Sequence, residues 1–363
     1  MPQAQQARRD RLAAVMSGRA LDAALVTDLV NVRYLSGFTG SNGALLLRAD
    51  GYAGFVSDGR YTDQAAAECP DVDRHTSREL AATLLAHADL TRGARLGVET
   101  HAMTVDAYES LREIVGNSGV DLISLDRAVE DLRVVKDDAE LDALRTACEI
   151  STNALQEVLA GPITGRTETQ IARDLEWRMY THGAEAVGFD TIVASGPNSA
   201  IPHHSPTGRV VERGDLLKID FGARYDGYHA DCTRTVVVGA AADWQREIYG
   251  AVRAAQQAGV DALVAGNPIS DGDKIPRGVL DEAGYLEAFT TGIGHGVGLV
   301  IHEDPFIKGE ATGTLLARTP LTMEPGIYLP GRGGVRIEDT LIVGDGAPTV
   351  LTTMTKDLQE IAG

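Results

Sequence analysis

Residues 216–238 read LLKIDFGARYDGYHADCTRTVVV, and this stretch decides the fold of the second half of the chain. Apolar runs flank an Asp-Gly turn signal, a pattern that predicts a β-hairpin. Asp220 and Asp231 are symmetric about the midpoint between Tyr225 and Asp226, so we expect them to be cross-strand neighbours. Directly opposed side chains lie roughly 4.5–5.5 Å apart at Cβ. Two carboxylates at that distance repel unless a cation lies between them or one is protonated.

Residues 321–343, LTMEPGIYLPGRGGVRIEDTLIV, repeat the arrangement. Glu324 and Glu338 are symmetric about Gly331, which lies in a turn rich in Pro and Gly. Between the two hairpins, His295 stands in TTGIGHGVGLVIHEDP, among glycines whose missing side chains let backbone and ligand approach closely. Two carboxylate pairs and one imidazole form a ligand set for a dinuclear metal centre.

The ligand types narrow the choice of metal. Carboxylate oxygens with a single imidazole suit Mn, Co, Fe or Zn in a site for two ions, and no thiolate is placed to help. Two divalent ions carry four positive charges, which four carboxylates balance. Bridging carboxylates hold such ions about 3.5–4 Å apart and bring the pKa of a shared water towards neutrality, which favours hydrolysis. The alternative is that these acids are ordinary surface charges among the 52 Asp and Glu residues.

Further histidines lie in loops near the expected metal site. His203 and His204 stand in SGPNSAIPHHSPTGR just before the first hairpin, and His302 follows His295 by seven residues. Loop histidines beside a cluster of carboxylates are candidates for moving a proton or for stabilising a developing oxyanion. Taken alone, each is equally compatible with an ordinary surface position.

Several motifs together resemble the M24 metallopeptidases with the pita-bread, or creatinase-like, fold: FDTIVASG, PHH, DFG with DCTRT, GIGHGVGLVIHE, MEPGIY and VRIED. The resemblance covers the whole chain and is closest to the proline-specific branch, the Xaa-Pro aminopeptidases and the Xaa-Pro dipeptidases (prolidases). It implies a hydrolase of small proline-containing peptides with two divalent ions per chain, Mn²⁺ first and Co²⁺ or Zn²⁺ as alternatives. It also implies a homodimer in which the partner's N-terminal domain approaches the active site.

The resemblance implies a role for each expected metal ligand. Asp220 would chelate one ion, and Asp231 would bridge both. His295 and Glu324 would hold the other ion, and Glu338 would be the second bridge. Glu324 would also shuttle the proton, as general base and then general acid.

The resemblance also implies the residues that surround the substrate. His203 matches the loop histidine of the family, with His204 as the neighbouring alternative if the register slips. His203 and His302 would line the substrate site and stabilise the tetrahedral intermediate. Independently of the resemblance, we expect Tyr328, which follows Glu324 in the same predicted strand, to form a pocket wall. Phe189 would pack against a proline ring, although a buried aromatic side chain needs no function.

Side-chain alternation along the second strand of each hairpin adds two candidates. Arg336 lies two residues before Glu338 and therefore on the same face of an extended strand. It would hydrogen-bond that carboxylate or contact the substrate; an ion pair without substrate contact is an equal alternative to the latter. Thr233 shares a face with Asp231 and would orient it, since hydrogen bonds from outer residues fix ligating carboxylates.

The length of the substrate is the open question within the family. Residues 34–47, YLSGFTGSNGALLL, resemble the GF-x-GS-x-G element of aminopeptidases P and lack the Asp and His that some prolidases carry there. We therefore expect an aminopeptidase that releases the first residue of X-Pro-Y peptides, with a dipeptidase acting on X-Pro as the alternative. A more remote alternative is a metal-free M24-fold protein that binds other proteins. Such proteins lose ligand residues, whereas this chain keeps all five.

Composition bounds the remaining possibilities. The net charge of −19 argues against a nucleic-acid partner, because no basic stripe is present to release counterions. Three cysteines, Cys69, Cys148 and Cys232, are scattered without CxxC spacing, which is typical of the reducing cytoplasm. The first 26 residues read as an amphipathic helix running into a strand rather than as a signal peptide. No apolar stretch reaches about 18 residues, so we expect no membrane span.

At 363 residues the chain is long enough for two domains. In the first third, strands are expected at 20–26, 43–58 (a hairpin), 94–99 and 121–125, and helices at Tyr61–Glu68 and Thr104–Val115. A long amphipathic helix then begins near Asp137 or Asp138 and ends at Gly161-Pro162. We therefore predict a smaller, creatinase-like α/β domain over 1–134 and an α+β pita-bread catalytic domain over 135–363.

Overall fold

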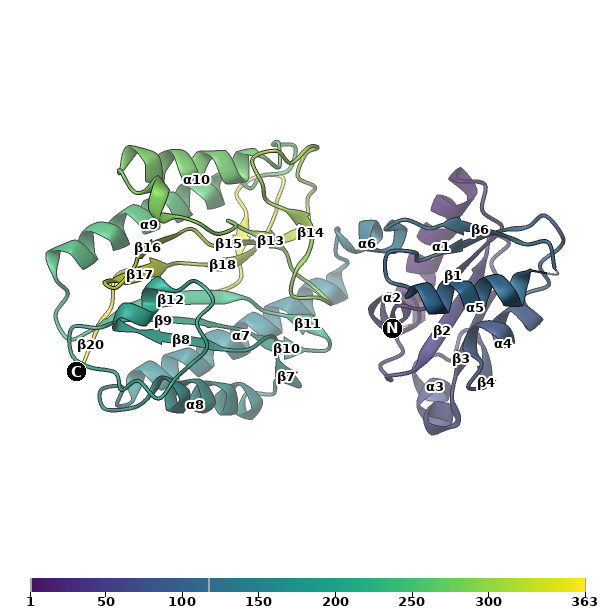
Figure 1. Cartoon of the computed structure of the whole chain (residues 1–363), viewed down its shortest axis with the longest axis horizontal. Coiled ribbons are helices and arrows are strands. Elements are labelled where there is room, and N and C mark those ends of the chain that lie inside the picture. Colours follow the sequence, from purple (N-terminus) through teal and green to yellow (C-terminus); the bar gives the residue numbers. More distant parts are fainter. Residues whose placement is uncertain (1, 117, 363) are drawn as a thin grey trace. The chain divides into compact units, whose positions relative to one another are not determined.

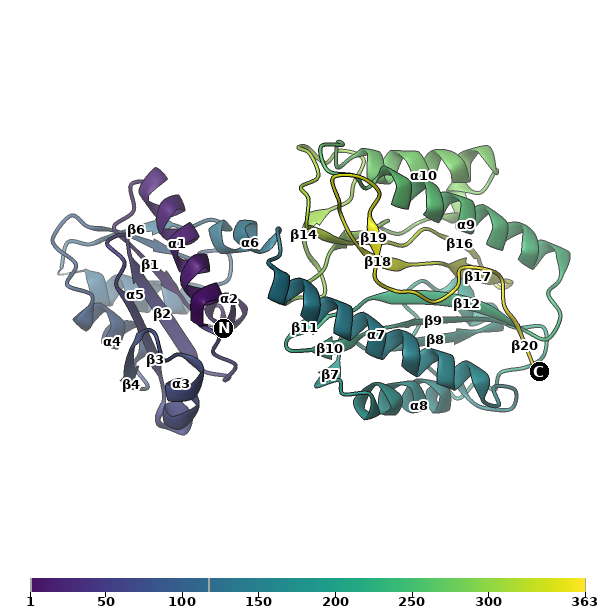
Figure 2. The ribbon, with the colours of Figure 1, turned by 180° about the vertical axis from the view of Figure 1, so that it is seen from behind.

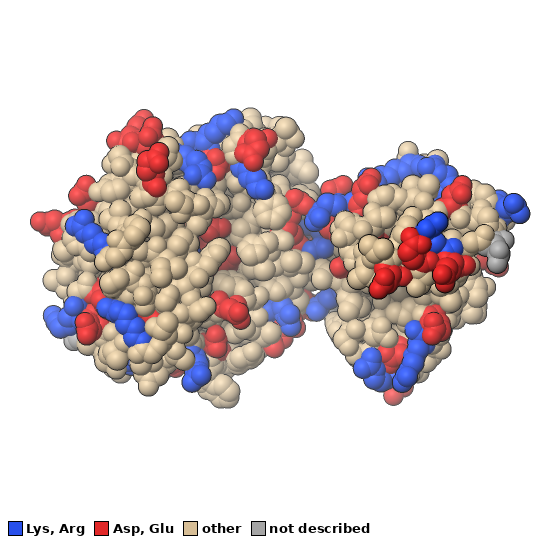
Figure 3. All heavy atoms as spheres, viewed as in Figure 1, with Lys and Arg blue, Asp and Glu red and all other residues tan. Residues whose placement is uncertain are grey.

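The computed structural model describes residues 2–116 and 118–362 and divides into two units, Met1–Arg133 and Val134–Gly363 (Figures 1 and 2). No helix in these described ranges is long and apolar enough to span a bilayer. On the face drawn in Figure 3, acidic and basic side chains are interspersed over each unit, so the excess negative charge is not gathered into one patch of that face.

Within the described residues, the first unit is an α/β domain built on a six-stranded sheet with the order β4-β3-β2-β1-β5-β6. Its strands are β1 (Ala23–Val26), β2 (Gly43–Arg48), β3 (Ala53–Ser57), β4 (Asp73–Thr76), β5 (Arg95–Val98) and β6 (Asp121–Ser124). Its helices are α1 (Pro2–Gly18), α2 (Leu29–Ser36), α3 (Thr62–Glu68), α4 (Leu80–His87), α5 (Val105–Val115) and α6 (Ala128–Arg133), with the short η1 (Gly59–Tyr61).

The strands and helices expected in the first unit are present, including the β2–β3 hairpin. Its core forms where Ala23 and Leu25 of β1 face Leu84 of α4 and Leu111 of α5, all almost fully buried. Helices α2, α4 and α6 and the edge strand β4 were not expected, because their sequences are short and lack a clear apolar period.

The second unit contains all the expected metal ligands. Its helices are α7 (Asp138–Ala160), α8 (Glu168–Thr181), α9 (Asp243–Ala262) and α10 (Asp271–Glu282), with the short η2 (Gly196–Ala200) and η3 (Leu286–Ala288). Its strands are β7 (Ala186–Val187), β8 (Ile192–Ser195), β9 (Leu216–Phe221), β10 (Ala223–Tyr225), β11 (Tyr228–His229), β12 (Cys232–Val238), β13 (His295–Gly296), β14 (Glu303–Phe306), β15 (Pro320–Met323), β16 (Gly326–Leu329), β17 (Gly333–Arg336), β18 (Asp339–Ile342), β19 (Thr349–Val350) and β20 (Glu360–Ile361).

Helix α7 begins and ends where its sequence predicts. The Asp137 side chain accepts a hydrogen bond from the backbone N–H of Glu140, whose side chain accepts one from the N–H of Asp137. This reciprocal capping box satisfies two of the amide groups that a helix start leaves without partners. Gly161 caps the other end, and Pro162 follows it. The prediction of this long helix is confirmed.

The two larger sheets of the second unit, β20-β12-β9-β8 and β14-β13-β15-β18-β19, are mainly antiparallel and lie between two helix pairs (Figure 1). The described residues of this unit also form the smaller sheets β11-β10-β7 and β16-β17. Strands β8, β9 and β12 pack on α7 and α8, with Ile219 and Phe221 facing Leu155 and Leu175. Strands β15 and β18 pack on α9, with Met323 in that second core. Because side chains alternate along a strand, the face of each sheet that does not pack on helices can present polar side chains to the space between the two sheets. This α+β architecture therefore leaves a polar interior between two apolar cores.

Two glycines of α9 allow a matched test of core packing. A Cβ added at buried Gly259 would clash with the Sδ atom of Met323, whereas a Cβ at exposed Gly250 would meet nothing within 4 Å. We expect Gly259→Ala to lower the free energy of unfolding by about 1–3 kcal/mol, as for overpacked cores. Gly250→Ala should raise it by about 0.4–1 kcal/mol. Urea unfolding of both variants measures the difference, and equal stability would contradict the packing described here.

Candidate metal centre

The first hairpin brings its two aspartates together with a different register from the one expected. Asp226 and Gly227 both have positive φ, 45° and 79°, as a two-residue type I′ turn requires. The turn is therefore centred between these two residues, one position later than predicted. The register then pairs Asp220 with Thr233, so Asp220 and Asp231 are diagonal neighbours rather than directly opposed. Diagonal side chains on one face remain within reach of a shared ligand.

The second hairpin has the predicted register. Strands β15 and β18 pair at the open end of the hairpin, and β16 and β17 pair between the glutamates and the turn. Both pairings have the same register, which is centred on Gly331. Glu324 and Glu338 are consequently cross-strand neighbours. The prediction from the sequence is confirmed for this pair.

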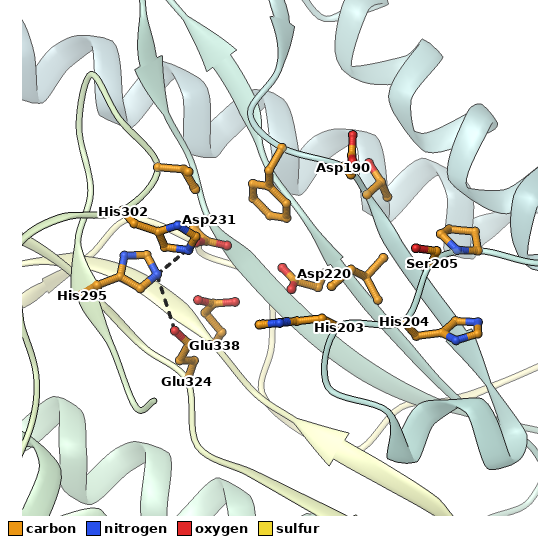
Figure 4. Close-up of a pocket in the computed structure, with 15 residues that line it drawn as sticks. Asp190, His203, His204, Ser205, Asp220, Asp231, His295, His302, Glu324 and Glu338 are labelled. Carbon is orange, nitrogen blue, oxygen red and sulfur yellow. Dashed lines mark ion pairs between the residues drawn. The ribbon is translucent and has the colours of Figure 1, made fainter. Parts of the chain in front are cut away.

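All five expected ligands line one pocket of about 360 Å³ (Figure 4). Ligand atoms of Asp231, His295 and Glu338 lie within 4.8 Å of one another. Nε2 of His295 is 3.6 Å from Oδ2 of Asp231 and 3.5 Å from Oε1 of Glu324. These distances leave room for a cation between the groups, since direct hydrogen bonds would be shorter.

The imidazole of His295 is held in the state that a metal ligand needs. Its Nδ1 lies 2.9 Å from the carbonyl oxygen of Gly296, so Nδ1–H donates and the Nε2 lone pair faces the carboxylates. Burial lowers the pKa of His295 to about 4, which keeps the ring neutral. A neutral ring with a free Nε2 can bind a divalent ion.

Asp220 supplies a second indication of a cation. Its Oδ2 accepts a hydrogen bond 2.5 Å long from the guanidinium of Arg336, but its buried Oδ1 has no hydrogen-bond partner among the described residues. A buried carboxylate oxygen without a partner is costly unless a cation or another donor compensates it. The residues present therefore fit divalent ions: Asp220, Asp231, His295, Glu324 and Glu338 would hold them.

The electrostatics of the carboxylates lead to the same conclusion. Burial, followed by repulsion from Glu338 and Asp220, raises the pKa of Asp231 well above its usual range. Burial and repulsion from Glu324 and Asp220 act in the same direction on the pKa of Glu338. Burial also raises the pKa of Glu324, to about 7. Such a cluster binds protons or divalent cations, and two divalent ions would balance its charge.

Neighbouring strands fix the direction of the bridging candidate Glu338. The hydroxyl of Thr233 donates a hydrogen bond to Oε2 of Glu338 at 2.7 Å. Thr233 therefore orients Glu338, whereas the sequence led us to expect that it orients Asp231. Behind it, Arg234 donates to the backbone carbonyl of Glu338 and to the buried carboxylate of Asp339. The Arg234–Asp339 pair was not expected, because its two members are more than 100 residues apart in the sequence.

The loop histidines flank the carboxylates in different ways. His203 and His302 both line the pocket, and the ring of His302 packs edge-on against His295 at a centroid distance of 4.5 Å. Burial and the neighbouring His203 lower the pKa of His302. In Figure 4 the ring of His203 points towards the carboxylates, whereas the ring of His204 points away. Nε2 of His204 lies 2.9 Å from the buried carboxylate of Glu168.

The other expected substrate contacts divide into two groups. Phe189 lines the pocket. Tyr328 and Arg336 lie behind the carboxylates instead: they are 5% and 2% exposed, and neither is among the residues lining the pocket. Arg336 donates to the hydroxyl of Tyr328 and forms its ion pair with Asp220, not with Glu338 as the strand alternation led us to expect. The pocket also contains Asp190, which the sequence analysis did not single out.

Comparison with known proteins agrees with this geometry. Residues 142–345 match the model of metallopeptidase family M24, and residues 8–135 match the Creatinase/Prolidase N-terminal domain. The Xaa-Pro dipeptidase of Pyrococcus furiosus is 35% identical over 360 residues, which cover 97% of this chain and 99% of that protein.

Two solved structures are similar over almost the whole chain. The Xaa-Pro dipeptidase from Bacillus anthracis has a TM-score of 0.93 at 34% identity, and the match covers 98% of this chain and 100% of that chain. The X-Pro aminopeptidase from Thermotoga maritima has a TM-score of 0.89 at 34% identity, with 97% and 99% covered. This chain therefore belongs to metallopeptidase family M24 and joins the pita-bread catalytic domain of that family to a creatinase/prolidase N-terminal domain.

Proposed function

We propose that this protein is an Xaa-Pro dipeptidase that hydrolyses the bond between the two residues of X-Pro substrates. The convergence of five metal-ligand side chains in one pocket carries the proposal of metal-dependent hydrolysis. The dipeptidase relatives, similar over their full lengths, support the dipeptide as substrate. They favour this alternative over the aminopeptidase that the loop at residues 34–47 led us to expect. A pocket of about 360 Å³ is small for a ligand site, which suits a short substrate.

The chemistry of the X–Pro bond explains why a metal centre is useful here. This bond is a tertiary amide without an N–H, so an enzyme that recognises that hydrogen cannot bind it. Two divalent ions, when bound, would supply a polarising charge for the carbonyl and a nucleophile from water. Glu324 would accept the proton of the attacking water and pass it to the proline nitrogen. His203 and His302 would donate hydrogen bonds to the developing oxyanion, and Phe189 would pack against the pyrrolidine ring.

An Xaa-Pro aminopeptidase is the second candidate, and two observations favour it. The T. maritima aminopeptidase is similar over the whole chain. In addition, no Lys or Arg is among the described residues that line the pocket, so imidazoles and bound metal ions are the groups left to meet a substrate carboxylate. A dipeptide presents that carboxylate beside the proline ring, whereas a longer peptide does not.

The metal, the assembly and the compartment are also proposals. We propose Mn²⁺ as the native ion, with Co²⁺ or Zn²⁺ able to replace it, since hard carboxylate ligands outnumber the single imidazole. We propose a homodimer in which the loop 39–43 of one protomer approaches the active site of its partner. All three cysteines are free and buried, which supports a reducing compartment such as the cytoplasm.

Metal removal should reduce both activity and stability. Chelation should abolish hydrolysis of Ala-Pro, and added Mn²⁺ should restore it with about two ions per chain. Because the ions relieve carboxylate repulsion, Mn²⁺ at 100 times its Kd should stabilise the fold by about 2.7 kcal/mol per site, measured as a rise in Tm. Asp231→Asn should lose metal, whereas Asp190→Asn, a pocket acid outside the ligand set, should retain it. Full activity of a demonstrably metal-free sample would contradict the proposal.

Replacing His302 should impair turnover without emptying the metal site. We expect His302→Ala to lower kcat by about 10²–10⁴, the usual contribution of a group that moves protons or stabilises charge, and to leave the metal content nearly intact. His203→Ala should behave alike. His182→Ala, at a histidine whose partner is Glu157 and which does not line the pocket, is the matched control. Normal turnover by His302→Ala would show that its assigned role is wrong.

The two candidate activities differ in their preferred substrate length. We expect kcat/KM for Ala-Pro to exceed that for Ala-Pro-Ala under the same Mn²⁺ concentration, as for a dipeptidase. Ala-Pro-amide, which lacks the terminal carboxylate but has nearly the same size, separates recognition of charge from recognition of length. A strong preference for the tripeptide would make the protein an aminopeptidase.

A further inference from the structure

Glu168, the first residue of α8, lies outside the metal site and the pocket but is fully buried. Its two carboxylate oxygens accept six hydrogen bonds. Oε1 accepts from the backbone N–H and the hydroxyl of Ser195, both at 2.8 Å, and from Nδ2 of Asn198 at 2.9 Å. Oε2 accepts from Nε2 of His204 at 2.9 Å, and from the backbone N–H and the hydroxyl of Thr207 at 3.0 and 2.6 Å.

These hydrogen bonds fix the position of the Glu168 carboxylate and stabilise its charged form. Burial by itself would raise the pKa of this carboxyl, but the hydrogen bonds from Thr207, Asn198 and His204 outweigh it and lower the pKa to about 2. A buried carboxylate without such donors would cost several kcal/mol. Removing the Glu168 carboxylate would leave six donors without their acceptor, and this cost holds the chain segments that supply them in place.

Three of the six donors, those of His204 and Thr207, belong to residues 201–207, and this segment carries His203 between two sets of anchors. Before His203, the carbonyl oxygens of Ile201 and Pro202 accept hydrogen bonds from buried Lys218 at 2.6 and 3.1 Å. Arg336 also donates to the carbonyl oxygen of Pro202, at 3.1 Å. After His203, the anchors are the contacts of His204 and Thr207 with Glu168.

His203 itself has a different environment from its anchored neighbours. Its imidazole is exposed to the pocket, has no hydrogen-bond partner among the described residues and points towards the carboxylates (Figure 4). Little apolar packing holds the segment, since the side chain of Ile201 is 47% exposed. Hydrogen bonds from buried side chains therefore set the position of this ring.

We propose that Glu168 is a positioning residue for peptide hydrolysis: it holds residues 201–207 so that the His203 imidazole faces the reacting carbonyl. Glu168 does not touch substrate and acts through His203. The sequence contains no local signal for this role, because Glu168 lies 27 residues before Ser195 and 39 before Thr207. The proposal rests on the proposed function, in which His203 stabilises the tetrahedral intermediate.

A double-mutant cycle tests whether Glu168 acts through His203. Glu168→Gln keeps the size of the side chain but turns an NH₂ group towards some of the donors. We expect it to lower kcat on Ala-Pro by about tenfold or more, since small misplacements of a catalytic group have effects of up to about 100-fold, and to leave KM and metal content nearly unchanged. In the His203→Ala background the same change should lower kcat by less than about twofold. An equal loss in both backgrounds would overturn the proposal.

A control and a measurement without activity complete the experiment. Glu176→Gln, on the same helix but with no hydrogen bond to residues 201–207 among the described residues, should change neither background. Hydrogen exchange of the peptide covering 195–209 should be faster in Glu168→Gln than in wild type or Glu176→Gln. Unchanged hydrogen exchange in Glu168→Gln would overturn the proposal whether or not the protein hydrolyses X-Pro peptides. Inactivity of the wild-type protein on X-Pro peptides would contradict the proposed function, which is a separate result.

A milder variant covers the case in which Glu168→Gln does not fold. Thr207→Val removes one hydroxyl donor while keeping the shape of the side chain. We expect faster exchange over 195–209 and a smaller loss of kcat that again disappears in the His203→Ala background. A loss of the same size in both backgrounds would overturn the proposal.

Discussion

Mutual repulsion among four clustered carboxylates, three of them buried, is the constraint on which the catalytic unit depends. Asp220 and Asp231 come from one hairpin, and Glu324 and Glu338 come from another about 100 residues later. Burial together with repulsion raises the pKa of Asp231 and Glu338 well above the usual range. Without compensating charge this arrangement is unstable, so the site and the cations it binds are one energetic unit.

The fold meets this constraint with rigid supports. Each carboxylate pair stands on a paired hairpin whose outer face packs into an apolar core against helices, so repulsion cannot push the strands apart without opening a core. Donors behind the strands fix individual oxygens: Arg336 binds one oxygen of Asp220, and Thr233 binds one oxygen of Glu338. All four carboxylate residues line the pocket. A close approach of two chain segments also explains the glycine after Phe221, since a Cβ on Gly222 would clash with the carbonyl oxygen of Ala230.

Much of this design is local in the sequence and was therefore predictable. Hairpins carry their signal in alternation and turn residues, and the Pro/Gly-rich turn gave the register of Glu324 and Glu338 correctly. For the first hairpin, the prediction that pairing centres on the midpoint of the two aspartates is wrong. The turn instead centres on the two residues with positive φ, Asp226 and Gly227, and this moves the pairing of Asp220 to Thr233. The supports of the site could not be predicted, because contacts such as Arg336 with Tyr328 or Glu168 with His204 depend on tertiary packing.

In the proposed function His295 would bind an ion and His203 would stabilise an oxyanion, and this difference accounts for where the two histidines stand in the fold. His295 would have to keep one fixed distance to an ion, and strand β13, which pairs with β15, provides a rigid position for it. His203 would have to reach the carbonyl of a bound substrate, and it stands on a loop. A loop by itself places a side chain less precisely than a strand does. Buried Glu168 and Lys218 on either side of His203 restore that precision through hydrogen bonds to the loop. A catalytic group on a loop can therefore be as well placed as a ligand on a sheet when buried polar groups hold the chain on both sides of it.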